Sequence, residues 1–405
     1  MVCLLLAVAF GAPDVFLISV DTLRADRLGA YGSTLGATPA LDAFCKEGLV
    51  FEDCVCEQPL TGPSFCSMMT SQYPRMLGVV QNGIPLAEGL PTAAVQFQNA
   101  GYETCCIQSN WPLRPHLCGL NRGFEKYDDG FELEQPNARR GQRAADEVTR
   151  LALDALRKRD GKRPLFMWVH YTDPHAPYRF HADFNPGGRR LEGLDTAGQI
   201  RVKYDSDVAF TDHHIGLFLK AIPKDNTFVV FVADHGESLL EHGYLGHGKR
   251  IYQESMHVPL VIRGPSVAPG RVRVPARGID VCPTLLALAG LPNLPGMLGL
   301  NLLGPLPEDR VRVVETYVGD KPDVWQGVVH GDWKLVIPPG TGPQLFNLSD
   351  DPAENSNLAA NEPVRLQELI AKLKEWDATV LKAPRAAYKV NKEDKKAFQA
   401  LGYLR

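Results

Sequence analysis

Residues 15–20 (VFLISV), followed directly by Asp21, decide the fold of this chain. The run is apolar and rich in β-branched residues, which is typical of a strand buried on both faces of a sheet. Residues 165–171 (LFMWVHY) and 228–233 (FVVFVA) have the same character. Shorter candidate strands are residues 103–108 and 259–263.

Helical periodicity lies between these runs, over residues 142–159, 199–222 and 281–289. Strands that alternate with helices predict an α/β fold, in which a large, mostly parallel or mixed sheet is sandwiched by helices. In such sheets the polar residues just beyond the carboxyl ends of the strands gather into a ligand crevice. Asp21 and Asp234 stand at such positions.

The pattern changes after about residue 310. Residues 311–318 and 327–337 read as strands of a hairpin-rich antiparallel sheet, and a helix is predicted near residues 363–380. We therefore predict a large α/β domain over residues 13–310 and a small α+β subdomain with a tail over residues 311–405.

The composition indicates a soluble globular protein. The chain has 405 residues, enough for a large core, with 44% hydrophobic and 22% charged residues. Its formal net charge of −4 supplies no basic footprint for nucleic acid and no acidic tail. A small molecule or an ester is therefore a better candidate substrate than a polyanion, and no nucleic-acid partner is expected. The sequence leaves the oligomeric state open.

Residues 1–12 (MVCLLLAVAFGA) are apolar and end in small residues, like the hydrophobic region and cleavage zone of a signal peptide. However, no Lys or Arg precedes the apolar run, and residues 13–21 already read as a strand. We expect export to the periplasm or the extracellular space. The alternative is a cytoplasmic protein with a buried first strand and a frayed start. No other run is long and apolar enough to span a bilayer.

The nine cysteines show no paired Cys-x-x-Cys spacing of the kind that binds zinc. Most are expected to be small buried hydrophobic residues. In an exported protein one or two disulfide bridges could form, with a connectivity that the sequence does not give.

Asp21, Asp234 and His235 form the first chemical constellation. Two carboxylates and an imidazole at the ends of buried strands suit a divalent cation, because fixed oxygen and nitrogen ligands preorganise its site. The alternative is that each aspartate caps the following turn or helix, a common structural role. The ligand types suit Ca²⁺, Mg²⁺, Mn²⁺ or Zn²⁺ and do not choose among them.

Thr61 opens a second element, Thr-Gly-Pro-Ser over residues 61–64. Pro63 suits the first turn of a helix. A hydroxyl at a helix start faces free backbone N–H groups and the positive end of the helix dipole, which together make an anion site. The alternative is that Thr61 is only the N-cap of that helix.

Three loops carry further candidates. His175 lies between two prolines after a buried strand, which suits a general acid or oxyanion donor, although a structural histidine would fit there too. His247 and Lys249 lie in a Gly-His-Gly-Lys loop, whose glycines let a cation approach an anion closely, although loop lysines are otherwise mostly solvated. Asn82, in a Gln-Asn-Gly loop, is a weaker candidate for substrate contact.

Together these stretches resemble the sulfatase family of the alkaline-phosphatase-like superfamily over nearly the whole chain. Residues 61–74 (TGPSFCSMMTSQYP) align without gaps on the family signature, Cys/Ser-x-Pro-Ser-Arg followed by a leucine-rich helix and Thr-Gly-x-Tyr-Pro. The other stretches that carry the resemblance are residues 20–26 (VDTLRAD), 233–237 (ADHGE), 246–259, 278–291 (GIDVCPTLLALAGL) and 333–358.

The resemblance implies a metal-dependent ester hydrolase, but it also has departures. In sulfatases the signature cysteine or serine is oxidised to formylglycine, and Thr61 holds that position here. Oxidation of a threonine would give a ketone, so formylglycine is not expected. The signature arginine is Phe65, and the usual double aspartate is Asp21-Thr22. One metal ligand and one electrostatic partner are therefore missing from the family pattern.

Relatives on the same fold do use a threonine nucleophile. The phosphoethanolamine transferases and lipoteichoic acid synthases pair a metal-bound threonine with an acidic residue and an Asp-His pair. Asp21, Thr61, Asp234 and His235 match that set in type and order. A cation lowers the pKa of a hydroxyl and polarises the ester oxygen, which makes the arrangement physically sensible.

Our leading hypothesis is therefore a hydrolase of sulfate-type esters, acting on a small-molecule or glycan ester with one divalent cation. Thr61 would be the nucleophile and a ligand of the cation beside Asp21, Asp234 and His235. The catalytic residues would be Thr61, Lys249 and His175, the last protonating the leaving group. Substrate oxygens would be bound by Lys249, His247 and Asn82.

Three alternatives stay open. The same site could hydrolyse phosphate monoesters, diesters or phosphonates, towards which the threonine shifts the balance. A degenerate, non-catalytic family member could bind an anionic ligand or a partner, as Phe65 and the lost second aspartate suggest. A transferase could pass the group to an alcohol, but the related transferases carry membrane spans that this sequence lacks.

Overall fold

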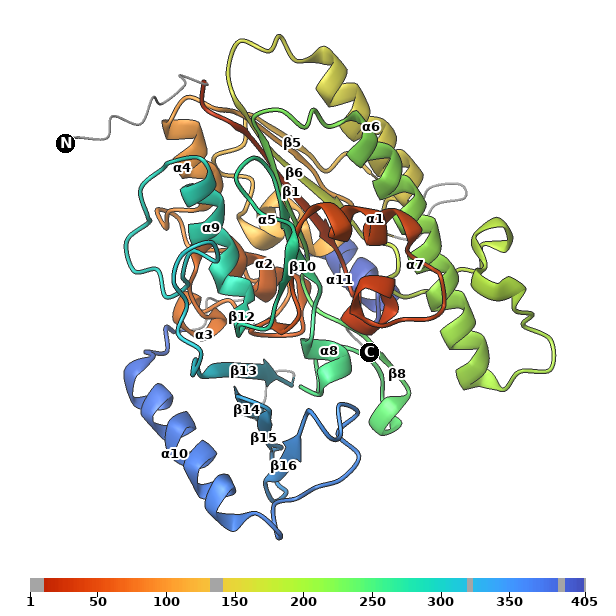
Figure 1. The fold of residues 1–405 in the computed structure, drawn as a ribbon, viewed down its shortest axis with the longest axis vertical. Coiled ribbons are helices and arrows are strands. Elements are labelled where there is room, and N and C mark those ends of the chain that lie inside the picture. The colour runs from red at the N-terminus through yellow and green to blue at the C-terminus, as the bar shows by residue number, and fades with distance from the viewer. Residues whose placement is uncertain (1–10, 132–140, 319–322, 385–389, 404–405) are drawn as a thin grey trace.

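The computed structural model describes residues 11–131, 141–318, 323–384 and 390–403. Within them, eight strands form one large mixed sheet (Figure 1). In order across the sheet these are β11 (Gly270–Val272), β2 (Leu49–Phe51), β10 (Leu260–Arg263), β7 (Thr227–Ala233), β1 (Asp14–Val20), β6 (Leu165–Tyr171), β4 (Glu103–Ile107) and β5 (Lys126–Asp128). The expected α/β fold with a mostly parallel sheet is confirmed.

The centre of the sheet is parallel. β1 pairs in parallel with β6 and with β7, and β4 pairs in parallel with β6 and β5. β10 runs antiparallel to its neighbours β7 and β2, which makes the sheet mixed. Phe16 to Ile18 of β1 are fully buried, because β1 lies between two strands and is covered on both faces.

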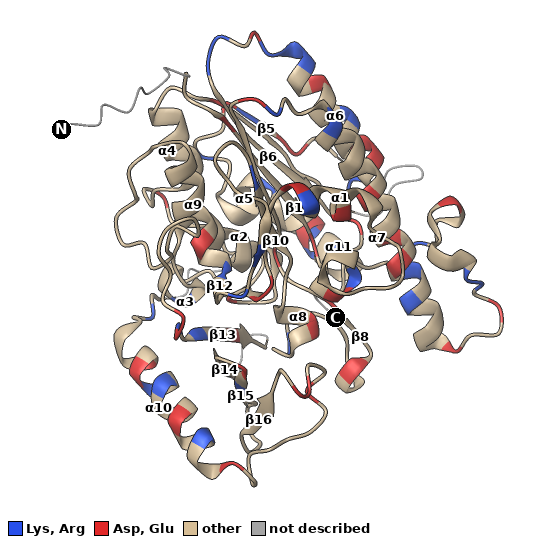
Figure 2. Ribbon diagram, viewed as in Figure 1, with Lys and Arg blue, Asp and Glu red and all other residues tan. Residues whose placement is uncertain are grey.

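Two groups of helices cover the sheet (Figure 1). One group is α1 (Pro39–Glu47), α6 (Ala145–Lys158) and α7 (Thr196–Ala221). The other is α2 (Thr61–Thr70), α4 (Ala93–Asn99), α5 (Pro115–Cys118) and α9 (Val281–Leu288). Acidic and basic residues are interspersed along α6 and along α10 (Pro363–Thr379), so neither helix presents a basic face (Figure 2).

Short elements connect these layers. The remaining helices of the large body are α3 (Pro74–Leu77) and α8 (Gln253–Met256), and its short strands are β3 (Cys54–Val55), β8 (Ser238–Leu239), β9 (Leu245–Gly246) and β12 (Ala276–Arg277). The 3₁₀ turns are η1 (Ala25–Arg27), η2 (Gly29–Tyr31), η3 (Trp111–Leu113), η4 (Ala182–Phe184), η5 (Pro186–Gly188), η6 (Glu241–Gly243) and η7 (Gly278–Asp280).

A second sheet follows, as expected after residue 310. Its antiparallel strands are β13 (Arg312–Tyr317), β14 (Val324–His330), β15 (Trp333–Ile337) and β16 (Gln344–Asn347). Helix α10 (Pro363–Thr379) packs on this sheet through buried Leu369 and Leu373. Helix α11 (Lys392–Ala400) instead packs against η3 of the large body. The division of the chain into domains at residue 310 stays a prediction.

Two features of composition can be followed in the structure. Eight cysteines fall in the described residues, and all eight are buried and free of disulfide bonds. Burial raises the pKa of several of their thiols, including Cys66, which lies on α2. Within the described part of the chain, no helix has both the length and the apolarity that a membrane span needs. The predicted signal segment lies almost wholly outside the described residues.

Candidate active site

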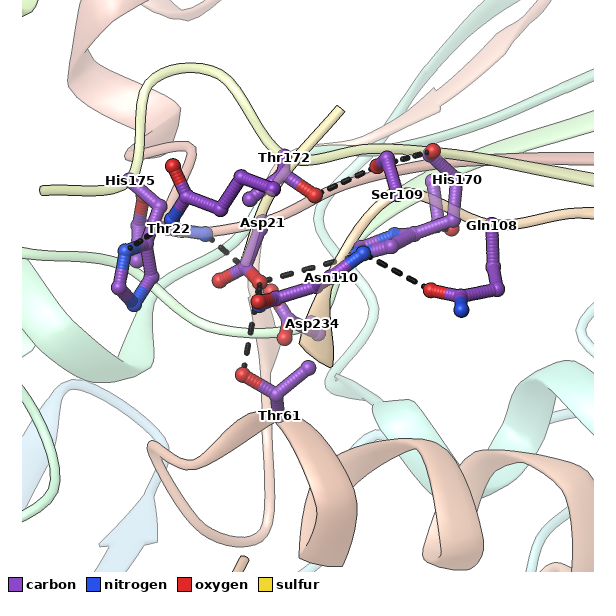
Figure 3. Close-up of polar contacts among 12 residues, drawn as sticks. Asp21, Thr22, Thr61, Gln108, Ser109, Asn110, His170, Thr172, His175 and Asp234 are labelled. Atoms are coloured by element: carbon purple, nitrogen blue, oxygen red, sulfur yellow. Dashed lines mark hydrogen bonds and ion pairs between the residues drawn. The ribbon is translucent and has the colours of Figure 1, made fainter. Parts of the chain in front are cut away.

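The carboxyl ends of four neighbouring parallel strands converge on one site (Figure 3). Asp21 follows β1, and Asp234 follows β7. Asn110 comes shortly after β4, and His175 lies in the loop after β6. Because adjacent parallel strands end at the same edge of a sheet, residues up to 213 positions apart in the chain are brought together here.

Asp21, Asp234 and His235 form a group of ligand atoms that fits a cation. Their candidate atoms all lie within 4.8 Å of one another, and all three residues are fully buried. His235 Nε2 is 3.7 Å from Asp21 Oδ1 and 3.4 Å from Asp234 Oδ2. None of these three atoms has a hydrogen-bond partner among the described residues. Buried polar atoms are normally satisfied, so this convergence of three unsatisfied ones fits a divalent cation.

The other oxygens of the two aspartates are engaged by the protein. Asp234 Oδ1 accepts hydrogen bonds from the backbone N–H groups of His235 (2.9 Å) and Thr22 (3.2 Å). Asp21 Oδ2 accepts one from the side-chain amide of Asn110. Asp234 therefore does close the turn that follows its strand, as the structural interpretation expected, but only with one of its two oxygens. The other oxygen faces the group.

The pKa values of Asp21, Asp234 and His235 are shifted in different directions. Burial raises the pKa of Asp234 well above its usual range, and the neighbouring charge of Asp21 raises it further. Burial also opposes ionisation of Asp21, but the imidazoles of His170, His175 and His235 outweigh it and hold the pKa of Asp21 low. Burial lowers the pKa of His235 to about 3, so its ring is neutral and able to coordinate a metal.

Thr61 is the first residue of α2, and its side chain points towards Asp21 (Figure 3). Thr61 Oγ1 lies 3.4 Å from Asp21 Oδ2. The interpretation of Thr61 as a helix cap is wrong, because Leu60 holds the N-cap position and no side chain caps this helix. The hydroxyl is therefore not used to satisfy the helix, and it faces the ligand group instead.

Two hydrogen bonds fix the start of α2 against the strand ends. Ser64 Oγ donates to the carbonyl of Asp234 (2.7 Å), and the backbone N–H of Gly62 donates to Asn82 Oδ1 (2.7 Å). A Cβ on Gly62 would come within 2.9 Å of Asn82 Oδ1, so glycine allows this close approach. Asn82 therefore holds the helix start, while its Nδ2 is buried without a hydrogen-bond partner among the described residues.

His175 is buried beside this site. Its Nδ1 lies 2.6 Å from the carbonyl of Ala176, which places a proton on Nδ1 and leaves Nε2 facing the site in the neutral ring. Gln142 Nε2 lies 2.9 Å from the same Nδ1. Burial lowers the pKa of His175, although the negative charge of Asp21 acts in the opposite direction.

His247, Lys249 and Asn82 line one cavity of about 500 Å³, together with Glu237. His247 Nδ1 lies 3.0 Å from Glu237 Oε1, and its ring centre is 4.4 Å from that of His235. Burial raises the pKa of Glu237 to about 7 and lowers the pKa of His247 to about 4. The structure thus brings all eight residues predicted from the sequence to the same site or its cavity.

The two departures from the family pattern have different local structures. Phe65 is fully buried and packs on Trp168 and His170, with ring centres 4.9 Å away in each pair. Thr22 has a φ of 56°, a left-handed conformation that is unfavourable for a β-branched residue. Its hydroxyl is buried without a hydrogen-bond partner among the described residues. The side chain at position 65 is therefore part of the apolar core. The side chain at position 22 instead has a buried hydroxyl oxygen with no hydrogen-bond partner among the described residues.

Sequence reasoning missed three side chains at this site. Asn110 bonds Asp21 and lies just past the end of β4, so the strand-end rule that found Asp21 could have found it. Glu237 lies in the stretch 233–237 that carries the family resemblance, but its local sequence assigns it no role. Tyr403, whose hydroxyl lies 3.2 Å from Thr61 Oγ1, had no signal in its local sequence.

Comparison with protein families gives one match that covers most of the chain. The family model described as Sulfatase matches residues 13–291. Among similar proteins, an uncharacterised sulfatase of Escherichia coli K12 is 23% identical, over 89% of this chain and 85% of its own length. A choline-sulfatase of Rhizobium meliloti is 25% identical, over 87% of this chain and 83% of its own length.

Solved structures share the fold. A 2-O GAG sulfatase superposes with a TM-score of 0.76 at 20% identity, covering 91% of this chain and 93% of the other. A phosphonate monoester hydrolase of Agrobacterium radiobacter superposes with a TM-score of 0.74 at 22% identity, covering 94% of this chain and 98% of the other. At these identities the likeness establishes the architecture, and the chemistry has to be argued from the site.

Proposed function

This chain belongs to the sulfatase family, and from that membership we propose that it is a metal-dependent hydrolase of sulfate-type esters with Thr61 as its nucleophile. One observation carries the proposal. The Thr61 hydroxyl does not cap its helix, and it lies 3.4 Å from Asp21, a member of the unsatisfied ligand group. A nucleophile at a helix start beside a cation site is suited to attack an anionic ester.

Asp21, Asp234 and His235 would hold one divalent cation, with Thr61 beside it. Such a cation supplies two effects, a lower pKa for a nearby hydroxyl and polarisation of an ester oxygen. Asn110 orients the Asp21 carboxylate by a hydrogen bond to Oδ2. Formylglycine is not part of the proposal, because residue 61 is a threonine.

The chain's own residues divide the remaining steps. Thr61 Oγ1 attacks the sulfur atom, its proton passing towards Asp21 Oδ2, while the bond between sulfur and the leaving oxygen breaks. His175 in its protonated form donates a proton from Nε2 to that leaving oxygen. Water then gives a proton to His175 Nε2 and attacks the sulfur atom of the Thr61 ester. The bond between sulfur and Thr61 Oγ1 breaks, and the proton at Asp21 returns to Thr61. Lys249 and His247 bind the non-bridging oxygens, and the Asn82 amide lies close enough to the cavity to help.

Phosphate and phosphonate esters are the second candidate substrates. A threonine hydroxyl lacks the hydrated aldehyde of the sulfatase nucleophile, which removes one reason to restrict the site to sulfate. The similar structure of a phosphonate monoester hydrolase illustrates that this architecture can carry such chemistry. A non-catalytic anion-binding role is the third candidate, favoured by Phe65 in place of the signature arginine and by Thr22 in place of the second aspartate.

A substrate screen tests the proposal. Aryl sulfates, phosphate monoesters, phosphate diesters and phosphonates would be offered with Ca²⁺, Mg²⁺, Mn²⁺ or Zn²⁺, with Thr61→Ala in parallel. We expect turnover of at least one ester class that depends on the cation and is lost in Thr61→Ala. Full turnover by Thr61→Ala on every active ester would contradict the nucleophile assignment.

Cation binding is expected to stabilise the fold. A ligand that binds only the native state at 100 times its Kd adds about 2.7 kcal/mol to the free energy of unfolding. Metal-stripped protein should therefore show a rise in Tm when a divalent cation is added, measured by calorimetry. Because burial raises the pKa of Asp234, protons compete with the cation for its carboxylate, and the cation affinity should increase with pH.

A matched pair of variants controls this measurement. Asp234→Asn removes a ligand charge and should abolish the cation-dependent rise in Tm. Asp212 is also a buried aspartate, but its carboxylate binds the backbone N–H groups of Ala40 and Leu41 at the start of α1. Asp212→Asn should therefore keep the rise. An equal response of both variants would place the cation elsewhere.

A further inference from the structure

The hydroxyl of Tyr403 lies between the proposed nucleophile and the proposed acid. It is 3.2 Å from Thr61 Oγ1 and 2.8 Å from His175 Nε2. It can donate to the lone pair of His175 Nε2, and the same phenol oxygen lies within hydrogen-bond distance of Thr61 Oγ1. One side chain thus satisfies the two groups that the reaction needs free.

Tyr403 reaches this place because α11 is anchored on the large body. Asp394 Oδ1 accepts a hydrogen bond from Trp111 Nε1 (2.9 Å), and both carboxylate oxygens lie 3.1 Å from His116 Nε2. Asn391 caps the helix by accepting from the backbone N–H of Asp394 (2.8 Å). The apolar contacts form a small cluster separate from the main core: Trp111, Leu117, Phe131, Ala397, Phe398 and Leu401.

Substrate and Tyr403 cannot occupy the site together. In the reaction the transferred sulfur or phosphorus must stand about 3–3.5 Å from Thr61 Oγ1, with the leaving oxygen on its far side towards His175. Here one phenol oxygen lies within hydrogen-bond distance of both residues, so the space that they share is already filled. The phenol thus takes the position that the reacting group of an ester would need.

We propose that residues 390–403 form an internal gate, in which Tyr403 occupies the reaction position and has to withdraw before an ester binds. This rests on the proposed function. Opening would break few contacts, because α11 is short and its apolar cluster is small, and such units open locally at low free-energy cost. Phe398, Leu401 and Tyr403 also line the 500 Å³ cavity, so their withdrawal would widen the entrance for the alcohol part of the ester.

If residues 390–403 act as a gate, weakening the contacts that hold α11 on the large body should increase the affinity for a ligand of the active site. A ligand that binds only the open state has an apparent Kd divided by the open fraction, so a larger open fraction tightens binding. Asp394→Ala removes the contacts with Trp111 and His116 that hold α11 on the large body, and it changes no residue of the site. We expect it to lower the Kd for inorganic phosphate in the presence of the divalent cation by about fivefold, the effect of losing roughly one hydrogen bond. Glu393 is exposed on the same helix, so Glu393→Ala is the matched control and should leave the Kd for phosphate unchanged.

Tyr403→Phe separates a gate from a catalytic contact. The variant keeps the ring but loses the bonds to Thr61 and His175. For the best p-nitrophenyl ester of the substrate screen, a gate predicts a lower KM with kcat unchanged or raised. A drop in kcat at unchanged KM would instead make the hydroxyl a participant in the reaction and overturn the gate.

Amide hydrogen exchange measures the opening of residues 390–403 in the absence of turnover. Full-length protein with its cation would be compared with and without saturating phosphate. We expect faster exchange of residues 390–403 when phosphate is bound, with no change in α10 as the internal reference. Equal phosphate affinity in the wild type and Asp394→Ala, with unchanged exchange, would overturn the gate alone. Absence of phosphate binding and turnover in every variant would overturn the proposed function, and the gate with it.

Discussion

Replacing Thr61 by valine is expected to lower kcat by about 10⁴- to 10⁶-fold, the scale seen when an enzyme loses its nucleophile. Valine has nearly the shape of threonine, so the packing at the start of α2 should survive and the Tm should change little. The hydroxyl is the only group removed, and it lies 3.4 Å from Asp21 Oδ2. Steady-state kinetics on the preferred ester, with the cation at saturation, measures the loss.

Thr61→Ser is the matched control, because serine keeps the attacking hydroxyl and drops only a methyl group. It should retain most of the activity and bind the cation like the wild type. If valine and serine at this position gave the same kcat, the hydroxyl would have no part in the bond-making step. A large fall in Tm for Thr61→Val alone would instead assign Thr61 a structural role.

Removal of the imidazole in His175→Gln should cost about 10²- to 10⁴-fold in kcat/KM, the usual contribution of general acid catalysis. The loss should depend on the leaving group. An alkyl ester needs its leaving oxygen protonated, whereas p-nitrophenolate departs readily without a proton. We therefore expect a large loss on alkyl esters and a small one on p-nitrophenyl esters. Equal losses on both would show that His175 binds the substrate and does not protonate it.

The pH profile follows from the same assignment. Burial lowers the pKa of His175, so the protonated form that acts as the acid becomes scarcer as the pH rises through the acidic range towards neutrality. For alkyl esters kcat/KM should fall with increasing pH, and this fall should be absent in His175→Gln. A profile that rises over the same range in the wild type would require a basic role for His175.

The central strands could be predicted closely from the sequence. The run 165–171 coincides with β6, and the runs 15–20 and 228–233 each differ from β1 and β7 by one residue. Strands buried on both faces have to be continuously apolar, which leaves an unambiguous signal. The strands β2, β5 and β11 have only three residues each, and β5 and β11, which lie at the two edges of the sheet, also carry polar positions. Such short runs give no periodicity that predicts a strand.

The site was predictable where it depends on strand ends and not where it depends on distant packing. The strand-end rule found Asp21 and Asp234, which the structure brings together with His235. Thr61 was harder, since the sequence could not tell the first helical residue from the cap before it. Tyr403 lies 342 residues from Thr61 in the chain, and only the tertiary packing of α11 on η3 brings them into contact.

The stereochemical course of hydrolysis tests the central claim most directly. A phosphorothioate analogue of the preferred ester would be made chiral at phosphorus with two oxygen isotopes and hydrolysed in water that carries the third, so that the thiophosphate product is chiral. Attack by Thr61, followed by attack of water on the Thr61 ester, gives two in-line displacements, each of which inverts the centre. We expect net retention of configuration. Net inversion would mean that water attacks the substrate directly, and it would contradict Thr61 as the nucleophile.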